Sequence, residues 1–587
     1  MKRKRILAVY GRFVGFHGRR LPLYILSVLV GGAALWGICL TQGRMLNTVV
    51  RIAEGTAGAD AAAGMLRLAA AFVLLALLMG AASVGTAWVE SRTAGVLRAR
   101  MLETRCRTTE TAARRISESD LFTRLGDDLD RSVEAVGSEV NAIYLNPIVS
   151  GALSLLTMSG INWRLGLFSA VLSVVVCLPL EAMRRRTSAL QAEMRADQAA
   201  VAGQYADMLG GAEEIRVFSL FSWIERRLRR RTEALEARHR RYAALDHLRL
   251  EWFSLGYYIH MIGLIAIGGL LAGKGVLPFS TVFITLPLSG QVMQMVQGFG
   301  RLWAYISERT PAMERVLEVL DAPAEAEHGD GTVPAAGADI RFDQVTFGYT
   351  EEKRVLEDIS FFIPQGSSVA FVGESGCGKS TVLRLLMGLY PARSGSITVG
   401  GQTAGQVGLD AWRRKIAYIG QTDGLFDMTV GENIALGHGG VLPPEKLARA
   451  AEMAAVDFAG AADRGWDTPV GEGGRLLSGG QRQRIAAARG FAMEQASVLL
   501  MDEPTAALDA AAEEKIRQTV CSLHGRQTVV MVSHRLRFSA GCDRIYVLDD
   551  GRIAEEGTHD QLLARKGIYA RLWAGQNGDG QMPPDGV

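Results

Sequence analysis

The sequence predicts a multidomain protein, in which an all-α transmembrane domain of six helices precedes an α/β P-loop nucleotide-binding domain. Three observations predict this fold class. The long apolar stretches all fall within residues 1–320. From residue 339 onward, short β-patterned runs alternate with helical ones, which is typical of an α/β domain. A Gly-rich phosphate-binding motif stands near the start of that second half, at residues 373–381.

Composition supports a membrane protein and excludes some partners. The chain has 587 residues, of which 48% are hydrophobic, so more than one domain is expected. The mean hydropathy of +0.13 is high for a soluble protein. A net charge of +3 gives no reason to expect nucleic acid as a partner. The six cysteines form no C-x-x-C pair and are expected to be reduced thiols without metal.

Six apolar stretches are each long enough to cross a hydrocarbon core of ~30 Å. Asn146 and Pro147 dilute the third stretch, which we expect to pack against neighbouring helices rather than lipid. An even number of spans places both ends of the chain on one side. The predicted spans are 21–41, 65–89, 142–161, 164–182, 252–273 and 278–303.

Basic residues predict which side of the membrane that is. Arginines cluster at 184–186 and 226–231, within the two long polar segments 90–141 and 183–251. The positive-inside rule places these segments, the N-terminus and the nucleotide-binding domain in the cytoplasm, in a multi-pass protein of the cell membrane (plasma or inner). A signal peptide is the alternative for the first apolar run, but its length and the lack of a small-residue cleavage site favour a retained helix.

Composition also predicts the domain boundaries. The transmembrane domain is expected to cover 1–320 and the nucleotide-binding domain 339–574. Residues 321–338 are rich in Ala, Gly and Pro, as linkers are. Residues 575–587 are expected to be a disordered tail.

The phosphate-binding motif stands in the context that its chemistry requires. It follows a buried-strand pattern at 369–372 and leads into a helix, so glycine backbone N–H groups and a helix N-terminus meet the phosphates. Lys379 is expected to reach the β- and γ-phosphates, and Ser380 to bind Mg²⁺. The expected contacts are Gly373, Glu374, Ser375, Gly376, Cys377, Gly378, Lys379, Ser380 and Thr381.

Two further stretches carry polar groups suited to the same chemistry. The apolar run 498–501 ends in Asp502, placed to hold Mg²⁺, and in Glu503, a candidate general base or water-orienting group. Ser478, Gly479 and Gly480 precede a basic helix and expose backbone donors to an anion. The sequence alone therefore predicts a second phosphate contact there.

The stretch Leu477–Gln481 (LSGGQ), about a hundred residues after the phosphate loop and shortly before Asp502 and Glu503, resembles the ATP-binding cassette (ABC) ATPases. With the apolar half, the chain resembles an ABC transporter half of the exporter fold. In that family this stretch faces the phosphate loop of a second subunit. The resemblance therefore implies a dimer, with itself or a homologous subunit, in which ATP also contacts Leu477, Ser478, Gly479, Gly480 and Gln481.

The resemblance assigns three more positions. It implies that Tyr349 stacks on adenine, that Gln421 senses Mg²⁺ and the membrane domain, and that His534 contacts the γ-phosphate. The expected catalytic residues are then Glu503, His534, Gln421 and Lys379, and the expected Mg²⁺ ligands are Ser380, Gln421 and Asp502. It also implies coupling helices near 118–128 and 216–226. The departures are mild: Cys377 occupies a tolerant position, and Ala506 stands where many relatives have Ser.

A polar stripe in the sixth span bears on the cargo. Gln291, Gln294 and Gln297 follow each other at helical spacing, with Arg301 four residues on. The stripe either faces a cavity or forms hydrogen bonds between helices. His260 in the fifth span is open to the same two interpretations. Two methionines in the sixth span offer an adaptable apolar surface for a cargo: Met293 and Met295.

By resemblance, the expected function is ATP-driven transport, most simply export of an amphipathic small molecule, lipid or peptide. Alternatives are an importer built on the exporter fold, as in siderophore uptake, and one subunit of a heterodimeric transporter. A soluble ABC protein of repair or translation is a further alternative, against which the six spans argue.

Overall fold

The computed structural model describes residues 2–56, 58, 60–325, 338–351, 353–421, 424–458, 464–505 and 507–577. The chain forms two compact units. The first comprises Met1–Cys106 and Glu118–Asp321, and the second comprises Arg107–Ser117 and Ala322–Val587. The second unit therefore includes a short piece of chain from the polar segment that follows the second span.

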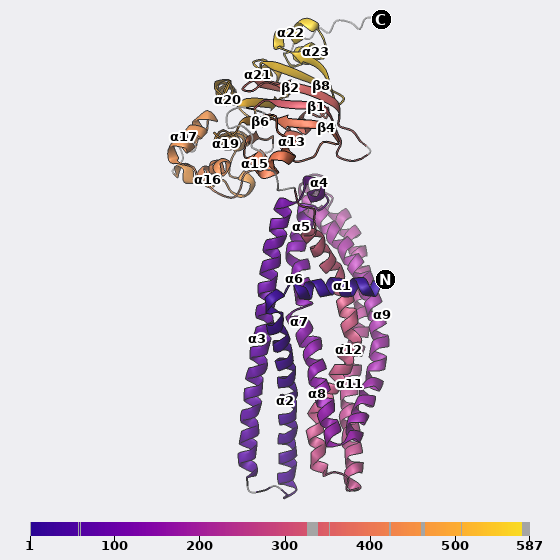
Figure 1. Cartoon of the computed structure of the whole chain (residues 1–587). Helices are drawn as coiled ribbons and strands as arrows, with labels where there is room; N and C mark the ends of the chain where they lie inside the picture. Colours follow the sequence, from indigo (N-terminus) through magenta and orange to yellow (C-terminus); the bar gives the residue numbers. More distant parts are fainter. Residues whose placement is uncertain are drawn as a thin grey trace. The chain divides into compact units, whose positions relative to one another are not determined.

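The first unit is built of long helices that lie side by side (Figure 1). Among the described residues, six helical stretches are long and apolar enough to cross a membrane, which confirms the predicted number of spans. The helices extend well beyond the apolar parts. They are α1 (Lys2–Gly15), η1 (Gly18–Arg20), α2 (Leu21–Ala53), α3 (Ala61–Arg107), α5 (Glu118–Thr123), η2 (Arg124–Asp128), α6 (Leu129–Glu134), α7 (Ser138–Val140), η3 (Asn141–Leu145), α8 (Asn146–Ile161), α9 (Trp163–Gly210), α10 (Ala212–Val217), α11 (Phe221–Gly273) and α12 (Phe279–Leu320).

Helix α12 is the centre of this packing, since it contacts α8, α2, α9 and α11, while α9 also runs along α11. Small residues allow the close approaches. A side chain on Gly43 of α2 would meet the backbone of Ile284, and one on Gly151 of α8 would meet the backbone of Gln291. The third span, which the sequence marked as weak, is accordingly packed against α12 through α8.

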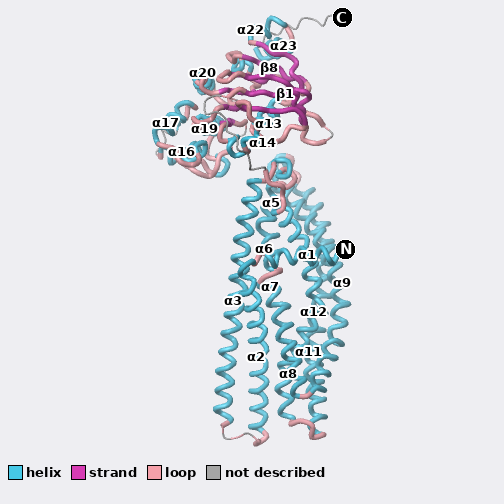
Figure 2. The backbone as a smooth tube through the Cα atoms, in the orientation of Figure 1, coloured by secondary structure: helices cyan, strands magenta, loops and turns pink. Residues whose placement is uncertain are grey.

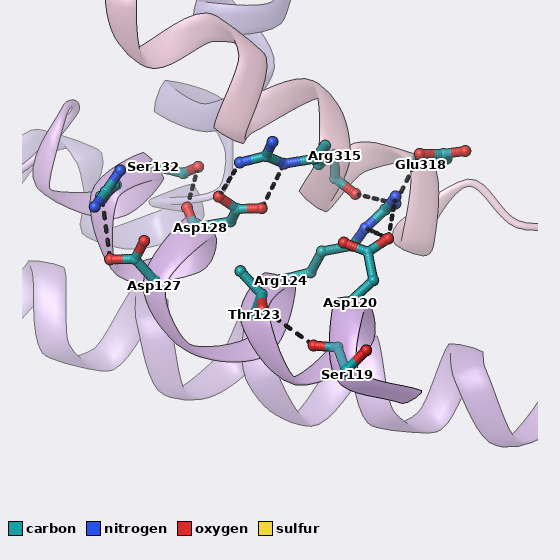
Figure 3. A network of polar contacts seen from close by, with 10 residues as sticks. Ser119, Asp120, Thr123, Arg124, Asp127, Asp128, Ser132, Arg315 and Glu318 are labelled. Carbon is teal, nitrogen blue, oxygen red and sulfur yellow. Dashed lines mark hydrogen bonds and ion pairs between the residues drawn. The ribbon is translucent and has the colours of Figure 1, made fainter. Parts of the chain in front are cut away.

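A polar network joins the π-helical turn η2 to the end of α12 (Figure 3). Asp128 is 1% exposed and accepts two hydrogen bonds from Arg315, one of them 2.6 Å long from Nε. Arg124 donates to Glu318 over 2.7 Å and pairs with Asp120. These charge-assisted contacts fasten the short helices α5, η2 and α6 to α12.

The second unit contains two sheets, drawn in magenta in Figure 2. One is antiparallel, with the order β2-β1-β4, and the other has the order β5-β6-β7-β3-β8-β9 and is parallel except for β9. The strands β6 and β7 are buried along their whole length and read as continuous apolar runs, as central parallel strands do. The strands are β1 (Ile340–Phe347), β2 (Leu356–Ile363), β3 (Ser368–Val372), β4 (Ser394–Val399), β5 (Ile416–Ile419), β6 (Val498–Asp502), β7 (Thr528–Val532), β8 (Arg544–Asp549) and β9 (Arg552–Gly557).

Helices connect these strands and cover the sheets. The helices of the second unit are α4 (Glu110–Ala113), α13 (Lys379–Leu386), α14 (Ala404–Val407), α15 (Leu409–Arg413), α16 (Val430–Ala435), η4 (Leu436–His438), α17 (Pro444–Met453), η5 (Gly465–Asp467), η6 (Glu472–Gly474), α19 (Gly479–Phe491), α20 (Ala510–Ser522), α21 (Leu536–Ser539), α22 (His559–Arg565) and α23 (Ile568–Asn577). The α/β character predicted from the sequence is confirmed.

Both segments predicted to lack structure are partly ordered. In the predicted linker, Ala324 forms a β-bridge with Thr108, and Glu325 forms a two-pronged ion pair with Arg413. In the predicted tail, α23 continues to Asn577, because the side chain of Gln576 satisfies backbone groups of two residues near the end of β7. The remaining parts of both predictions, residues 326–337 and 578–587, lie outside the described residues.

The structure places the two predicted coupling helices in different surroundings. Residues 118–128 belong to the first unit, whereas 107–117 belong to the second, so the chain enters the second unit about ten residues before the predicted position. The predicted segment 216–226 spans the end of α10 and the start of α11, joined by a tight turn with Ser219 at φ 53°. The role of both segments as coupling helices stays a prediction.

Candidate nucleotide-binding site

The second unit contains a cavity of about 610 Å³. The strands β3, β6 and β7 run parallel, so their carboxyl ends meet at one edge of the sheet. The phosphate loop follows β3, Glu503 follows β6 and His534 follows β7. The cavity is lined by Tyr349, Val355, Ser375, Gly376, Gly378, Lys379, Ser380, Thr381, Arg384, Gln421, Glu503 and His534.

The phosphate loop has the backbone that the sequence predicted. Gly376 and Gly378 have φ of 86° and 108°, in the left-handed region that glycine adopts readily, and α13 begins directly after them. The side chain of Lys379 is 5% exposed, and its Nζ donates to the carbonyls of Gly373 (2.8 Å) and Glu374 (2.6 Å). A buried ammonium group is thus held by the loop at the cavity. Cys377 is also buried, with its Sγ 3.7 Å from the same Nζ.

Two acidic residues and a hydroxyl group meet beside the loop. Ser380 donates from Oγ to Oδ1 of Asp502 over 3.1 Å. Burial raises the pKa of Asp502 above its ordinary value and the charge of Glu503 adds to the rise, while the Ser380 hydrogen bond opposes it. Buried oxygen ligands in this number suit Mg²⁺, which proteins hold through one or two carboxylates together with substrate phosphates. The residues therefore fit the ion.

Glu503 is held from two sides. Gln421 donates from Nε2 to Oε2 over 2.9 Å, and Nε2 of His534 lies 3.0 Å from Oε1. The backbone of Glu503 has φ of 51°, which is unusual for a residue with a side chain, and its N–H donates to the carbonyl of Val532. Strained backbone of this kind clusters at functional sites. The structure thus brings together Gln421, Glu503 and His534, which lie far apart in the sequence.

Sequence reasoning missed Gln483, which holds the backbone of Glu503. Its Nε2 donates to the carbonyl of Glu503 over 3.0 Å, and its Oε1 accepts from the N–H of Ala507 over 2.9 Å. The side chain is 1% exposed and comes from α19, the helix that the LSGGQ stretch begins. The charge of this helix is visible in the sequence, whereas nothing in the sequence marks one of its amide side chains as buried.

The environment of Tyr349 adds two arginines that the sequence did not indicate. Arg384 donates to the Tyr349 hydroxyl over 2.8 Å, and Thr381 shares that hydroxyl over 3.0 Å. The guanidinium group of Arg114, from the 107–117 segment, lies 5.6 Å from the centre of the Tyr349 ring and 5.5 Å from that of Tyr390. Arg384 stands one helical turn after Ser380, a spacing that could have indicated it.

The LSGGQ stretch does not line this cavity. Ser478 caps α19 by accepting from the N–H of Gln481, and the Gln481 side chain in turn accepts from the N–H of Ser478. Leu477, Gly479 and Gly480 lie at the same helix start, partly exposed. A helix start of this kind can bind an anion, and here it lies apart from the residues that line the cavity.

In the first unit, part of the polar stripe of α12 forms contacts between helices and part of it faces a cavity. Gln291 is buried and accepts a hydrogen bond from Ser150 of α8 over 3.1 Å, which is a contact between helices. Gln294, Gln297 and Arg301 line a cavity of about 270 Å³.

The other candidates in the spans are packed within the bundle. His260 is buried and lies 3.0 Å from Ser169 of α9, a further contact between helices. Met293 is buried and Met295 packs against the core. Met293 therefore offers no free surface for a cargo, whereas Met295 is half-buried and its predicted role stays a prediction.

Comparisons with known proteins agree with this geometry. A family model described as ABC transporter matches residues 356–506, and one described as ABC transporter transmembrane region matches 21–296. Among curated proteins, the ATP-dependent lipid A-core flippase of Photorhabdus laumondii is 31% identical over 75% of this chain and 76% of the relative. The protein of the same name from Shewanella oneidensis is 32% identical over 78% of this chain and 76% of the relative.

A solved structure described as a bacterial Atm1-family ABC exporter with ATP bound has a TM-score of 0.77 and 26% identity. The match covers 96% of this chain and 99% of that one. The chain belongs to the ABC transporter family and has the exporter fold, with a transmembrane domain and an ATPase domain on one polypeptide. It is a multi-pass membrane protein that binds ATP and couples ATP hydrolysis to transport, and as a half-transporter it functions in a dimer. The soluble alternative is therefore excluded.

Proposed function

We propose that two copies of this chain form an exporter that moves an amphipathic lipid across the cell membrane, with the N-terminus and the ATPase domain in the cytoplasm. The observation that carries the dimer is the position of the LSGGQ stretch outside the cavity, which is lined by most of the other predicted ATP contacts. A site that is split in this way is completed by the same stretch of a second copy. The lipid cargo is supported by the relatives named lipid A-core flippases.

Each residue of the cavity has a role in this proposal. Lys379 and the loop amides bind the β- and γ-phosphates, and Tyr349 binds the adenine. Ser380, Asp502 and Gln421 would hold Mg²⁺, which would neutralise phosphate charge when bound. Glu503 accepts a proton from the attacking water, while Gln421 and His534 fix the orientation of its carboxylate. His534 also donates to the γ-phosphate.

The dimer is also supported by an apolar turn between α10 and α11. Phe218 and Phe221 are 68% and 74% exposed, and Val217 and Trp223 are exposed beside them. An exposed patch of this kind marks a protein interaction site. We assign to this turn the role of docking a membrane domain on an ATPase domain. In the first polar segment, we assign that role to residues 107–117.

The decisive experiment measures ATP hydrolysis by the chain purified alone in lipid nanodiscs, with Glu503→Gln as the blank. Turnover well above the blank is expected, because two copies complete two sites. Turnover equal to the blank would refute the homodimer and point to a heterodimer with a different subunit.

The direction and the cargo are tested in vesicles. With the ATPase domain outside, added ATP should move a fluorescent lipid from the outer to the inner leaflet, because the ATPase side corresponds to the cytoplasm. Movement in the opposite sense would support the importer alternative. Failure of several lipids, with transport of a soluble compound, would refute the lipid cargo.

A further inference from the structure

The cavity of about 270 Å³ in the membrane unit has an unusual charge at one end. Gln294, Gln297 and Arg301 of α12 face it, together with Phe253 of α11 and Tyr144 of η3. Its wall therefore combines aromatic and apolar surface with two amides and one guanidinium group. This is the composition of a site for an amphipathic molecule with a polar head.

Arg301 has no ion-pair or hydrogen-bond partner in the part of the chain that the structure describes. The charged groups of Arg249 and Arg184 repel it, and Tyr144 lines the same cavity. A half-buried guanidinium group without a counter-charge is costly, and in a membrane protein such a group marks a functional site.

The acidic residues near Arg301 have other partners, and two of them pair with the other two arginines of the cluster. Arg249 pairs with Asp246 over 2.7 Å and Arg184 pairs with Glu181 over 2.8 Å. The remaining acids are likewise engaged: Glu139 with Tyr305 and Arg309, and Glu308 with Arg195. The cavity therefore keeps an excess of positive charge.

A second observation comes from Arg249, whose Nε is buried without an acceptor among the described residues. It lies on α11 one helical turn before Phe253, which lines the cavity. Two guanidinium groups near one cavity thus keep donor capacity that the protein does not use. An unused buried donor calls for a ligand that accepts hydrogen bonds.

The position of the cluster along the spans indicates what that ligand is. Arg301 lies two residues before the end of the predicted sixth span, Arg184 two residues after the fourth, and Arg249 three residues before the fifth. All three therefore stand near the same membrane boundary, the depth at which lipid phosphates lie. Planar guanidinium groups bind phosphate through paired hydrogen bonds.

We propose that the cavity is an anion subsite, in which Arg301, aided by Arg249, receives the phosphate of an anionic lipid cargo, while Gln294 and Gln297 donate hydrogen bonds to neighbouring headgroup oxygens. This inference deepens the proposed function and rests on it for the lipid identity of the cargo. The charge, the unused donors and the cavity carry it independently of the ATPase site.

The test measures equilibrium binding of short-chain phosphatidic acid and short-chain phosphatidylcholine to the full chain in detergent without nucleotide. Wild type should bind phosphatidic acid at least about tenfold more tightly. Arg301→Gln should weaken phosphatidic acid binding by about 10- to 100-fold, the value of charge-assisted hydrogen bonds, and leave phosphatidylcholine unchanged. Arg301→Lys should recover part of the affinity, because it restores the charge without the planar fork.

Matched controls make the result specific. Arg240→Gln removes the same charge from an exposed position on α11 and should bind phosphatidic acid as wild type does. Arg249→Gln should weaken phosphatidic acid binding in the same direction as Arg301→Gln, which provides a second variant if the first unfolds early in a thermal scan. Equal affinity of wild type for both lipids, or unchanged binding by Arg301→Gln and Arg249→Gln, overturns the proposal.

A competition experiment separates a lipid headgroup from a free anion. Inorganic phosphate at the same concentration should not displace phosphatidic acid, because it lacks the chains that fill the apolar wall. Displacement by inorganic phosphate would assign the subsite to a soluble anion and overturn the lipid assignment. Since binding is measured without ATP, phosphatidic acid binding through Arg301 without ATP-driven lipid movement would refute the proposed function alone.

Discussion

The ATPase unit and the membrane unit place their functional residues by different means. In the ATPase unit, loops at the ends of β3, β6 and β7 bring Lys379, Glu503 and His534 to one edge of a buried sheet. In the membrane unit, the cavity is lined by side chains one turn apart on long helices, such as Gln294 and Gln297. A sheet edge fixes a geometry that few residues can satisfy, whereas helix faces admit many substitutions. We therefore expect substitutions at the ATPase site to lower activity much more than substitutions in the membrane cavity.

The largest effects are expected at the ATPase site, from Lys379→Ala and from Glu503→Gln. Lys379→Ala removes the buried ammonium group that serves the phosphates, and ATP turnover should fall at least about 100-fold, to the level of the Glu503→Gln blank. Turnover is measured by phosphate release in nanodiscs. Lys446→Ala, which breaks an exposed ion pair with Glu494, is the control and should keep wild-type turnover. Undiminished turnover by Lys379→Ala would contradict the phosphate-loop assignment.

Glu503→Gln should lower turnover by about 10²- to 10⁴-fold, the usual contribution of a general base. The amide keeps the size of the side chain and cannot accept the proton, so ATP should stay bound and trap the closed dimer. Retention of radiolabelled ATP after gel filtration measures the trap. Glu494→Gln is the matched control on the surface. Normal turnover by Glu503→Gln would remove Glu503 from the role of base.

In the membrane unit, Arg315→Ala should act on stability rather than on chemistry. It leaves the carboxylate of Asp128 buried without its partner, which should cost roughly 3 kcal/mol of unfolding free energy. A lower midpoint of thermal unfolding in detergent measures this loss. Arg131→Ala breaks the exposed pair with Asp127 and should change stability by less than about 1 kcal/mol. Equal midpoints for the two variants would show that the network in Figure 3 has little energetic weight.

The apolar turn tests how the two units communicate. Phe221→Asp places a charge in the proposed docking surface and should reduce lipid-stimulated turnover several-fold, while basal turnover in detergent persists. Val441→Asp alters an apolar side chain that is 80% exposed in the ATPase unit and serves as the control. If Phe221→Asp retains full lipid stimulation, the turn does not couple the units.

The smallest effect is expected within the cavity. Gln294→Ala should shift the relative transport of several cargoes by about two- to fivefold, since a single neutral hydrogen bond contributes about 1 kcal/mol or less. Basal ATP turnover should change less than this. Gln291→Ala loses a contact between helices and should lower stability without changing cargo preference. An unchanged cargo range for Gln294→Ala would remove it from the cargo site.

Much of the ATPase site could be predicted because its residues form contiguous motifs. The phosphate loop, Glu503 and His534 stand beside strands whose apolar pattern is plain in the sequence, and the structure brings them together. Gln483 and Arg114 could not be predicted, since nothing local relates either to Glu503 or Tyr349. Likewise, the end of the predicted tail carries Gln576, whose order depends on backbone groups forty residues away.

By itself, the sequence determined the number of spans, the class of the second domain and most of the residues that line the cavity of the ATPase unit. These follow from local hydrophobicity and motif spacing, which are properties of the chain before it folds. Tertiary structure alone decided that Gln291 binds a neighbouring helix while Gln294 faces a cavity, and that Arg301 has no ion-pair partner among the described residues. The reason is that the free energy of a polar group in a membrane depends on its neighbours across the fold, which spacing along one helix does not specify.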